Sequence, residues 1–440
     1  MAYDIIIGRT DSDKKKFGDR GTILLGRSYV KMGATTSMSN RVLMDVARSH
    51  VVLVAGKRGS GKSYTLSVIA EEMARLPHDI KKNLSMLFFD TMGIFWTMKY
   101  PNERDADLLA KWNIEPEGFD IDLFVPEGSF DEYKEKGIPV DHSFSIKTSE
   151  LSAEDWCSVF NISVVEPMGI LIDRIVGDLR DEGGDFDIID IVRIIKIDKR
   201  SDKTVKDAAE NRFLAAQKWG LFTRHGSKID ELIQPGRISI LDISAYRKSS
   251  GEWSIKGLVV GLITRKLLAE RLISRKAEEL EAIEQGTKYF GEEEKEELPL
   301  VWLFIDEAHE FLPKEGKNPA TDALIQVLRE GRQPGISCVI ATQQPGEIAR
   351  DVMTQSDIVI SHRVTAKADI ESLNAIMQTY LLNDVQAYLN NLPSWKGSAI
   401  ILDDNSERIY PMRVRPKISW HGGETPSSIK VRKREELGLL

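Results

Sequence analysis

Glycines, a lysine and a serine follow an apolar run at a fixed spacing in the first part of this 440-residue chain. Residues 51–63 read VVLVAGKRGSGKS, which places the pattern G-x-x-x-x-G-K-[ST] after five apolar residues. The apolar run predicts a short buried strand, and the apolar spacing in residues 64–76 predicts a helix directly after the loop. In such a loop, glycines let backbone N–H groups turn toward a phosphate, Lys62 can reach its outer oxygens and the Ser63 hydroxyl can hold Mg²⁺.

This pattern predicts a nucleotide site, because a strand and a helix flank the loop. The helix would direct the positive end of its dipole at the phosphates. A solvated turn of glycine and lysine is the alternative interpretation. The residues expected to bind the nucleotide are Gly56, Lys57, Arg58, Gly59, Ser60, Gly61, Lys62, Ser63 and Tyr64. Lys57 and Arg58, together with Arg48 ahead of the strand, are the weaker candidates.

A second apolar run, LVWLFIDEAH in residues 300–309, ends in two carboxylates. We expect Asp306 to bind Mg²⁺ through water and Glu307 to polarise the water that attacks the nucleotide. The pair therefore indicates hydrolysis of ATP as well as binding. A competing interpretation is that the two acids only cap a helix over residues 307–314. We expect His309 to pack or to hydrogen-bond within that helix and not to act as a catalyst.

A third run, CVIATQQPGEI in residues 338–348, is apolar at first and turns polar before Pro345. Proline cannot donate to a strand ladder, so the strand should end there. In a sheet that also carries Lys62 and Asp306, this strand would end near the γ-phosphate. Gln343 could then orient the attacking water or contact the γ-oxygens, which makes it a candidate sensor of the phosphate. Without the other two motifs, the segment would be an ordinary strand end.

Alternating strand and helix patterns connect these motifs. Further strands are predicted for residues 84–90, 237–244, 336–343, 357–364, 397–404 and 408–415, and helices for residues 255–283 and 318–333. The alternation predicts an α/β fold with a mostly parallel sheet, and the motifs indicate a RecA-like P-loop NTPase. The last two strands are close enough in sequence to form an antiparallel edge. Residues 149–235 have few strand signals and are interpreted as a helical insertion.

The composition argues against several classes of protein. Hydrophobic residues make up 42% and charged residues 29%, as in an ordinary globular chain. No apolar run reaches the roughly 18 residues of a membrane span, and the N-terminus lacks the layout of a secretory signal, so we expect a cytoplasmic location without membrane partners. Cys157 and Cys338 are too few for a disulfide framework, and a buried free thiol is expected. The net charge of −8 means that a polyanion would need a local basic lining.

The chain contains, in this order, GKRGSGKSYT, LFIDEAHEF, LREGRQPGISCVIATQQP and SDIVISHRV. Together these segments resemble the HerA branch of the HerA/FtsK superfamily of DNA-pumping ATPases, in motif order over roughly residues 42–415. Each motif is generic to P-loop proteins, whereas EGR followed by ATQ and a proline is more specific. The resemblance implies a ring, usually a homo-hexamer, that encircles double-stranded DNA, moves along it by hydrolysing ATP, and often works with a NurA-type nuclease. Related members serve in antiphage systems.

The resemblance also suggests a role for two arginines ahead of the Gln343 strand. Arg329 and Arg332 lie at i and i+3, so a helix would present both on one face. In a ring, that face could meet the ATP of the next subunit, where a guanidinium stabilises the charge of the transition state. The family comparison favours Arg332, within EGRQPG. The competing interpretation is a pair of solvated helix charges.

The motifs also suggest a domain organisation. We expect residues 51–420 to form the ATPase motor, with the helical insertion at about 149–235, and residues 421–440 to form a C-terminal tail that is disordered or docked on a neighbouring subunit. Residues 292–298 are acidic and expected to be solvated. The family usually carries a β-barrel before the motor. Here residues 1–50 are expected to form only a short β segment, a reduced barrel or a clasp, which puts barrel-dependent docking of a nuclease in doubt.

Two further departures from the family pattern lie at strand tips. After the strand at 84–90 the chain reads DTMGIFW, in which Asp90 and Gly93 match the family and Ile94 does not. Gln344 replaces the arginine that is more common at its position, so a positive charge expected there is absent.

The leading hypothesis is an ATP-driven, ring-forming translocase or helicase of duplex DNA, possibly acting with a nuclease in DNA end processing. Its DNA part depends on the resemblance, since nothing in the sequence marks a base-reading element. Residues 223–228, TRHGSK, could line a channel, although surface loops often carry such charges. The alternative is an ATP-gated assembly partner that regulates a nuclease or defence effector without processive movement. For a third hypothesis, a motor for protein or conjugative transfer, a membrane anchor would be expected.

Overall fold

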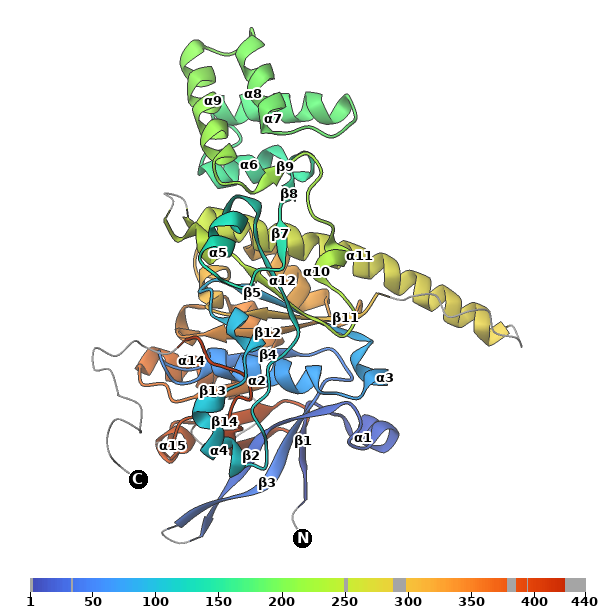
Figure 1. The fold of residues 1–440 in the computed structure, drawn as a ribbon, viewed down its shortest axis with the longest axis vertical. Helices are drawn as coiled ribbons and strands as arrows, with labels where there is room; N and C mark the ends of the chain where they lie inside the picture. Colours follow the sequence, from blue (N-terminus) through green and yellow to red (C-terminus); the bar gives the residue numbers. More distant parts are fainter. Residues whose placement is uncertain are drawn as a thin grey trace.

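A computed structural model of the chain describes residues 3–32, 35–248, 252–287, 298–377, 385–393 and 395–423. Within these residues, the centre of the fold is one 13-stranded sheet (Figure 1). Its strands are β1 (Ile5–Ile7), β2 (Thr22–Met32), β3 (Thr35–Asp45), β4 (Val51–Ala55), β5 (Leu84–Asp90), β6 (Ile121–Pro126), β7 (His142–Phe144), β10 (Ile238–Asp242), β11 (Leu300–Ile305), β12 (Ile336–Thr342), β13 (Ile358–His362), β14 (Ser398–Asp403) and β15 (Arg408–Val414). Across the sheet they run in the order β1-β3-β2-β15-β14-β13-β4-β12-β11-β5-β10-β6-β7.

The strands from β13 to β7 in this order are all parallel, which confirms the mostly parallel α/β fold. The strands β6 and β7 at one end of this parallel part had no predicted counterpart. β14 and β15 pair antiparallel, as expected. They do not form an edge of the sheet, however, because β2 pairs with β15 and continues it.

The N-terminal strands extend the main sheet. β2 and β3 form a long antiparallel pair, and β1 lies parallel to β3 at the outer edge. This pair supplies strands to the segment 1–50, for which a short β segment was expected. The hydrogen bonds of β2 to β15 therefore make this part of the chain continuous with the sheet that holds the P-loop strand β4.

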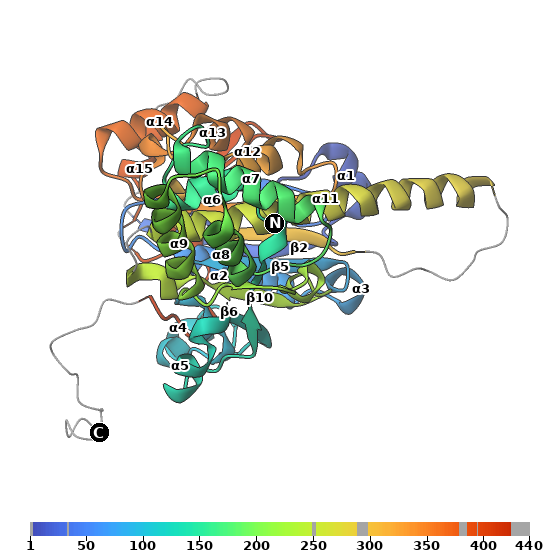
Figure 2. The same cartoon turned by 90° about the horizontal axis from the view of Figure 1, so that it is seen from above.

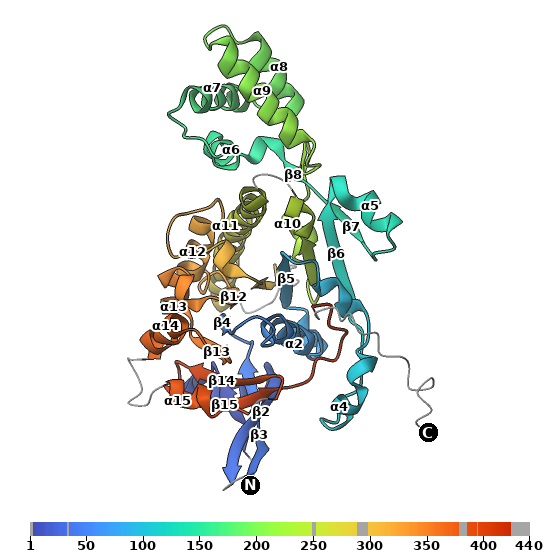
Figure 3. The ribbon, with the colours of Figure 1, turned by 90° about the vertical axis from the view of Figure 1, so that its left-hand side faces the viewer.

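Helices cover both faces of the sheet, as Figure 3 shows with α11 and α12 on one side and α2 on the other. The α-helices are α1 (Asp11–Phe17), α2 (Lys62–Ala74), α3 (His78–Lys81), α4 (Ala106–Ala110), α5 (Phe130–Glu135), α6 (Ala153–Phe160), α7 (Pro167–Asp181), α8 (Ile188–Ile197), α9 (Lys203–Gln217), α10 (Ile229–Leu232), α11 (Glu252–Thr287), α12 (Thr321–Glu330), α13 (Arg350–Gln355), α14 (Lys367–Met377) and α15 (Val385–Asn390). Short 3₁₀ turns are η1 (Phe95–Lys99), η2 (Glu103–Asp105), η3 (Glu127–Ser129), η4 (Thr148–Glu150), η5 (Ser244–Lys248), η6 (Ala308–Glu310) and η7 (Pro345–Glu347).

The strand β4 shows why two apolar layers form. Val52 and Val54 pack in the same core as Leu66 of α2, whereas Leu53 packs in the core that contains Leu258 of α11. Successive side chains of a strand point to opposite faces, so a fully apolar strand needs apolar cover on both. The continuous apolar runs of the sequence therefore become the central strands of a sandwich of helix, sheet and helix.

The segment expected to be helical, residues 149–235, contains α6 to α10. It also contains β9 (Phe222–Thr223), which pairs with β8 (Ile146–Lys147) at the base of the segment. Trp156 and Phe213 pack at 4.9 Å between ring centres and give the insertion apolar contacts of its own. The helices α6 to α9 stand at one end of the molecule, away from the main sheet (Figures 1 and 3), so that in the view along this direction they are seen in front of the motor (Figure 2).

Several composition-based expectations can be compared with the structure. Cys157 and Cys338 are both free and buried, as predicted. Within the described part of the chain, no helix combines the length and the apolar character that crossing a membrane requires. The acidic stretch at 292–297 and residues 424–440 of the expected C-terminal tail lie outside the described residues.

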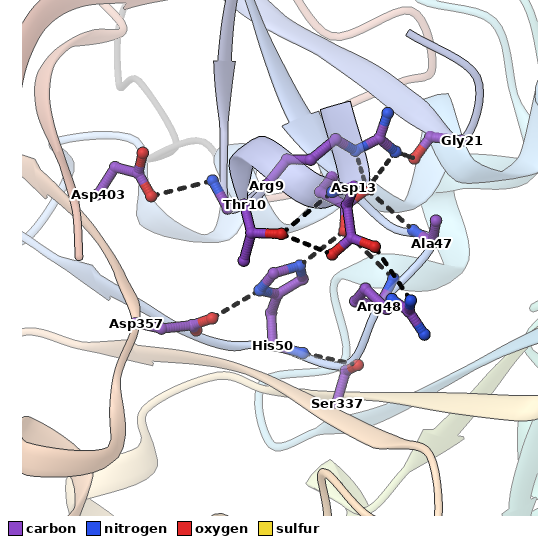
Figure 4. A network of polar contacts seen from close by, with 12 residues as sticks. Arg9, Thr10, Asp13, Gly21, Ala47, Arg48, His50, Ser337, Asp357 and Asp403 are labelled. Atoms are coloured by element: carbon purple, nitrogen blue, oxygen red, sulfur yellow. Dashed lines mark hydrogen bonds and ion pairs between the residues drawn. The ribbon is translucent and has the colours of Figure 1, made fainter. Parts of the chain in front are cut away.

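A buried network of charges joins the N-terminal segment to the sheet; we call Arg9, Asp45, His50 and Asp357 the clasp (Figure 4). Arg9 donates through Nε to Oδ1 of Asp45 at 2.9 Å, and both side chains are fully buried. The ring of His50 lies between two carboxylates, with Nε2 3.1 Å from Asp45 and Nδ1 2.6 Å from Asp357. Asp45 ends β3, His50 precedes β4 and Asp357 precedes β13, so the network connects three parts of the sheet.

The clasp requires a charged histidine. Burial by itself would lower the pKa of His50, but the hydrogen bonds and charges of Asp357 and Asp45 outweigh burial and raise this pKa to about 9. A protonated ring donates from both nitrogens, which is what two carboxylate partners need. Because the folded pKa is raised above the ordinary value of 6.5, the stabilisation is complete below pH 6.5 and is lost as the pH rises through 9.

We therefore expect the free energy of unfolding to fall by about 3 kcal/mol between pH 6.5 and 9.5 through His50 alone, since each unit of pKa shift corresponds to about 1.4 kcal/mol. The substitution His50→Gln should lower the melting temperature at pH 6.5 and flatten its decline toward pH 9.5. Thermal unfolding followed by circular dichroism at both pH values measures this, with His78→Gln at an exposed position as the control. An unchanged pH dependence in His50→Gln would contradict a charged clasp.

Candidate nucleotide-binding and hydrolysis site

The glycine-rich loop connects the end of β4 to the start of α2, as its sequence predicted. Gly61 has a φ of 110°, a left-handed backbone that favours glycine, and it is the N-cap of α2. Gly56 is closely packed, because a Cβ there would lie 2.4 Å from Oγ of Ser60 and 2.8 Å from Cβ of His362. The loop therefore has the compact backbone that turns N–H groups toward a phosphate.

Lys62, Ser63 and Asp306 meet beside this loop. The Ser63 hydroxyl donates to Oδ2 of Asp306 at 2.5 Å, and Nζ of Lys62 lies 3.4 Å from the carbonyl oxygen of Lys57. Burial lowers the pKa of Lys62, an effect that the charges of Glu307 and Asp306 oppose. Burial also raises the pKa of Asp306, although the hydrogen bond from Ser63 counteracts it. Ser63 and Asp306, predicted separately from distant motifs, thus form one contact pair.

The pair fits a magnesium ion. A hydroxyl and a carboxylate are hard oxygen ligands of the kind Mg²⁺ prefers, and a cation would favour the charged form of the buried Asp306 carboxyl. Ser63 and Asp306 would hold the ion, which supplies neutralisation of phosphate charge when it is bound.

Glu307 has an unusual backbone. Its φ of 50° and ψ of 45° are left-handed, which a residue with a side chain adopts at a cost of roughly 1–2 kcal/mol. One 3₁₀ turn, η6, follows it, so the helix expected over residues 307–314 is wrong. The sharp turn directs the carboxylate of Glu307 to Gln343, whose side-chain amide donates to Oε1. Strain of this kind is concentrated at functional sites, where the surrounding structure maintains it.

The glycine loop and the segment after β11 both contain buried polar atoms without a hydrogen-bonding partner. Within the described residues they include Oγ of Ser60, Oε2 of Glu307 and Nδ1 of His309. The last two face each other at 3.6 Å, too long for a good hydrogen bond. Burial lowers the pKa of His309, and the Lys62 charge adds to this effect. A phosphate oxygen would accept from the Ser60 hydroxyl and an attacking water would donate to the Glu307 carboxylate, so these atoms support a polar ligand at this edge.

His362 packs against the loop at Gly56 and contacts Thr65 of α2, a role that the sequence did not reveal. Burial lowers its pKa to about 4, so the ring is neutral. Nδ1 lies 3.1 Å from the carbonyl oxygen of Ser398, which can only accept, so Nδ1 carries the proton. Nε2 is then free to accept from the Thr65 hydroxyl at 2.8 Å, in the first turn of α2. A histidine ending an apolar strand was the available signal, visible within SDIVISHRV.

The three weaker nucleotide candidates, and Tyr64 with them, have different surroundings. Lys57 and Arg58 are exposed at the outside of the loop. The hydroxyl of Tyr64 accepts from the backbone N–H of Lys417, so it contacts the C-terminal segment. Arg48 precedes β4, at the opposite end of the strand from the loop, where it pairs with Asp13 at 3.0 Å. Of these four side chains, Arg48 is thus the one that the structure separates from the site.

The two arginines ahead of β12 do not share a helix face, which corrects the expected arrangement. The helix α12 ends at Glu330, so Arg329 lies in its last turn and Arg332 in the connection that follows. Arg329 pairs with Asp351 at 2.6 Å, whereas the Arg332 side chain is exposed. Both precede β12, whose 7 residues span about 23 Å at 3.3 Å per residue. Neither arginine can therefore reach the nucleotide site at the far end of its own strand.

The Asp90 tip of β5 builds a turn beside the site. Its carboxylate accepts from the backbone N–H groups of Met92, Gly93, Ile94 and Phe95 at 2.7–3.1 Å. Burial, followed by the charge of Asp242 on the paired strand β10, raises the pKa of Asp90 to about 7. The mismatch at Ile94 is therefore compatible with the turn, because only its backbone bonds to Asp90.

A glycine-rich P-loop between a parallel strand and a helix, together with an acid pair directly after a second strand, defines a P-loop NTPase with a RecA-like sheet. Two family descriptions match the chain, "Helicase HerA, central domain" at residues 30–267 and "Helicase HerA-like C-terminal" at residues 287–408. The chain belongs to the HerA family.

Its relatives are distant. The "DNA double-strand break repair helicase HerA" of Pyrococcus furiosus is 24% identical over 215 residues, which cover 44% of this chain and 37% of that protein. The "Probable DNA double-strand break repair helicase HerA" of Methanocaldococcus jannaschii is 27% identical over 150 residues, 32% of this chain and 28% of that protein. The matched segments thus span well under half of these relatives. VirB4 of Thermoanaerobacter pseudethanolicus shares the fold, with a TM-score of 0.53, 10% identity and coverage of 89% of this chain and 96% of that one.

We expect Glu307→Gln to reduce ATP turnover by about 10²–10⁴-fold, because an amide cannot take a proton from water. Nucleotide affinity should change little, since the Lys62 side chain and the loop backbone are unchanged. Steady-state phosphate release and titration with a fluorescent ATP analogue measure the two quantities. Glu315→Gln, the same change at an exposed position, is the control. Turnover close to that of the unsubstituted protein would show that Glu307 is not the catalytic base.

Proposed function

We propose that this chain is the ATPase motor of a ring that moves along duplex DNA, with a homo-hexamer as its working assembly. The observation that carries the proposal is the contact between Glu307 and Gln343 beside the Lys62, Ser63 and Asp306 group. It links the carboxylate that would activate water to the strand that would detect the γ-phosphate. The names of the archaeal relatives, which are double-strand break repair helicases, support DNA as the substrate.

In this proposal each side chain has one task. Lys62 and the loop N–H groups bind the β- and γ-phosphates, and Ser63 with Asp306 holds Mg²⁺. Glu307 accepts the proton of the attacking water. Gln343 donates one N–H of its side-chain amide to Glu307 in this structure, and the second N–H would be available to an oxygen of the γ-phosphate. Loss of the phosphate would then change the position of the β12 tip, which couples hydrolysis to movement.

The second candidate function is an ATP-gated partner of a nuclease or another effector, which assembles with ATP and does not move processively. One observation favours it: the N-terminal segment continues the main sheet through β2 and β15, and the clasp fixes it there. A segment held in this way could transmit nucleotide state to a partner. A partnership with a NurA-type nuclease or another effector, and a cytoplasmic location, belong to the proposal in either form.

Linear duplex DNA should stimulate ATP turnover, and the stimulation should fade as salt rises from about 50 to 200 mM, because a protein with several phosphate contacts loses affinity steeply over this range. Steady-state phosphate release with and without DNA, at both salt concentrations, tests this. Poly-glutamate of equal charge is the control for a general polyanion effect. Turnover that ignores DNA at both salt concentrations would favour the gated partner.

Arg332 should act on the nucleotide of a neighbouring subunit, since the length of β12 separates it from the nucleotide site of its own chain. We expect Arg332→Ala to reduce turnover by roughly 10³-fold or more, as loss of such an arginine does elsewhere. Mixing Arg332→Ala with Lys62→Ala chains should restore part of the activity, because a mixed ring contains some sites with both groups intact. Arg329→Ala, at the residue paired with Asp351, is the control and should have a smaller effect. Mixed chains without any recovery would contradict action between subunits.

A further inference from the structure

The connection between α8 and α9 carries a concentration of positive charge at the end of the insertion farthest from the sheet (Figure 1). We call residues 193–206 the distal turn. It holds six basic side chains, at 193, 196, 199, 200, 203 and 206, and two acidic ones, at 198 and 202. Six basic and two acidic side chains give residues 193–206 a formal charge of +4, opposite in sign to the net charge of −8 of the whole chain.

One acid of the distal turn is used to build it. The Asp198 carboxylate accepts from the guanidinium of Arg174 at 2.8 Å and from the backbone N–H groups of Arg200 at 3.2 Å and Ser201 at 2.8 Å. Lys206 donates to the Asp198 carbonyl oxygen at 2.8 Å, and the Asp198 side chain is only 10% exposed. These bonds fix the backbone of the turn and keep this carboxylate away from the surface.

Three cations remain on the outside. Lys199, Arg200 and Lys203 are exposed, and within the described residues none of their side chains forms an ion pair. Arg193 and Lys196 are exposed beside them but pair with Asp190 and Glu210. Three unpaired cations on a rigid backbone need no reordering of the turn to meet an anion, so less conformational entropy opposes binding.

The sequence places no aromatic residue between positions 187 and 212. Proteins that hold single strands usually stack bases on aromatic rings, whereas contact with the duplex backbone needs only cations. The other basic stretch of the insertion is less suited to this task. Arg224, in the cluster at 223–228, is held by the carboxylates of Asp187 and Asp190 and donates to the backbone of Asp185.

We propose that the distal turn contacts the phosphate backbone of duplex DNA through Lys199, Arg200 and Lys203. The inference rests on the proposed function and names a surface that would bear the substrate. In an acidic molecule, such a patch gives a polyanion one favourable place of approach. The contact would be independent of base sequence and sensitive to salt, because each phosphate neutralised releases counterions.

The test compares two triple variants of the full chain that lose the same charge. One is Lys199→Ala with Arg200→Ala and Lys203→Ala; the control is Lys111→Ala with Lys134→Ala and Lys136→Ala, at exposed positions of the motor. Binding of a fluorescent 40-bp duplex is followed by anisotropy over a salt series with a non-hydrolysable ATP analogue. For the distal-turn variant we expect the slope of log K against log salt to fall by about 2–3, at about 0.9 per phosphate contact. The affinity at low salt should fall at least about tenfold, and the control should keep its slope.

The outcomes separate the inference from the proposed function. If the unsubstituted chain binds no duplex at any salt concentration, the DNA function itself fails. If it binds and the distal-turn variant keeps both slope and affinity, only the inference fails. Weaker binding with an unchanged slope and a smaller assembly in light scattering would also overturn it, because the turn would then contact an acidic protein surface. Should the triple variant not fold, Lys199→Glu and Lys203→Glu singly, at exposed positions, carry the same test.

Discussion

The pairing register of three neighbouring strands determines where every part of the nucleotide site lies. Thr342 of β12 pairs with Ala55 of β4, and Ile340 of β12 pairs with Ile305 of β11. The residues that follow these positions leave the sheet at one edge, because parallel strands all end on the same side. The glycine loop, the acid pair and Gln343 are therefore neighbours although more than 200 residues separate the first from the second. A shift of one residue in either pairing would turn the site side chains to the other face.

The same constraint governs what supports the site. His362 ends β13 on the other side of β4 and holds Thr65 of the first turn of α2. The backbone N–H of Gly56 donates to the carbonyl oxygen of Thr342, so the loop is attached to β12 as well as to its own strand. At the opposite edge of the sheet, the clasp anchors the starts of β4 and β13 through His50 and Asp357. Both ends of the P-loop strand are thus fixed by buried histidines, one neutral and one charged, because their partners differ.

Charge is distributed differently in the motor and in the insertion. Several charges in the core are paired, as Arg9 is with Asp45 and Arg415 is with Glu71, since an unpaired buried charge is costly. In the insertion, Asp198 is turned inward while Lys199 and Arg200 remain outside. The insertion has an aromatic core of its own, so it can carry such a surface without disturbing the sheet. Its contacts with α11 include the ion pair of Lys266 with Glu150.

The sequence by itself determined the fold class and the family, and it proposed the residues of the candidate site, because all three depend on local patterns. Apolar runs of five to seven residues identified β4, β5, β11 and β12, and the glycine loop and the acid pair identified Lys62, Ser63, Asp306 and Glu307. Only the tertiary structure decided that β2 continues the sheet beyond β15, that Glu307 is left-handed and bonded to Gln343, and that Arg332 lies outside α12. It also decided that the pKa of His50 is raised, since that depends on the carboxylates of Asp45 and Asp357, which lie far apart in the sequence. Such contacts are set by long-range packing and by exclusion of water, neither of which has a periodic signal in the sequence.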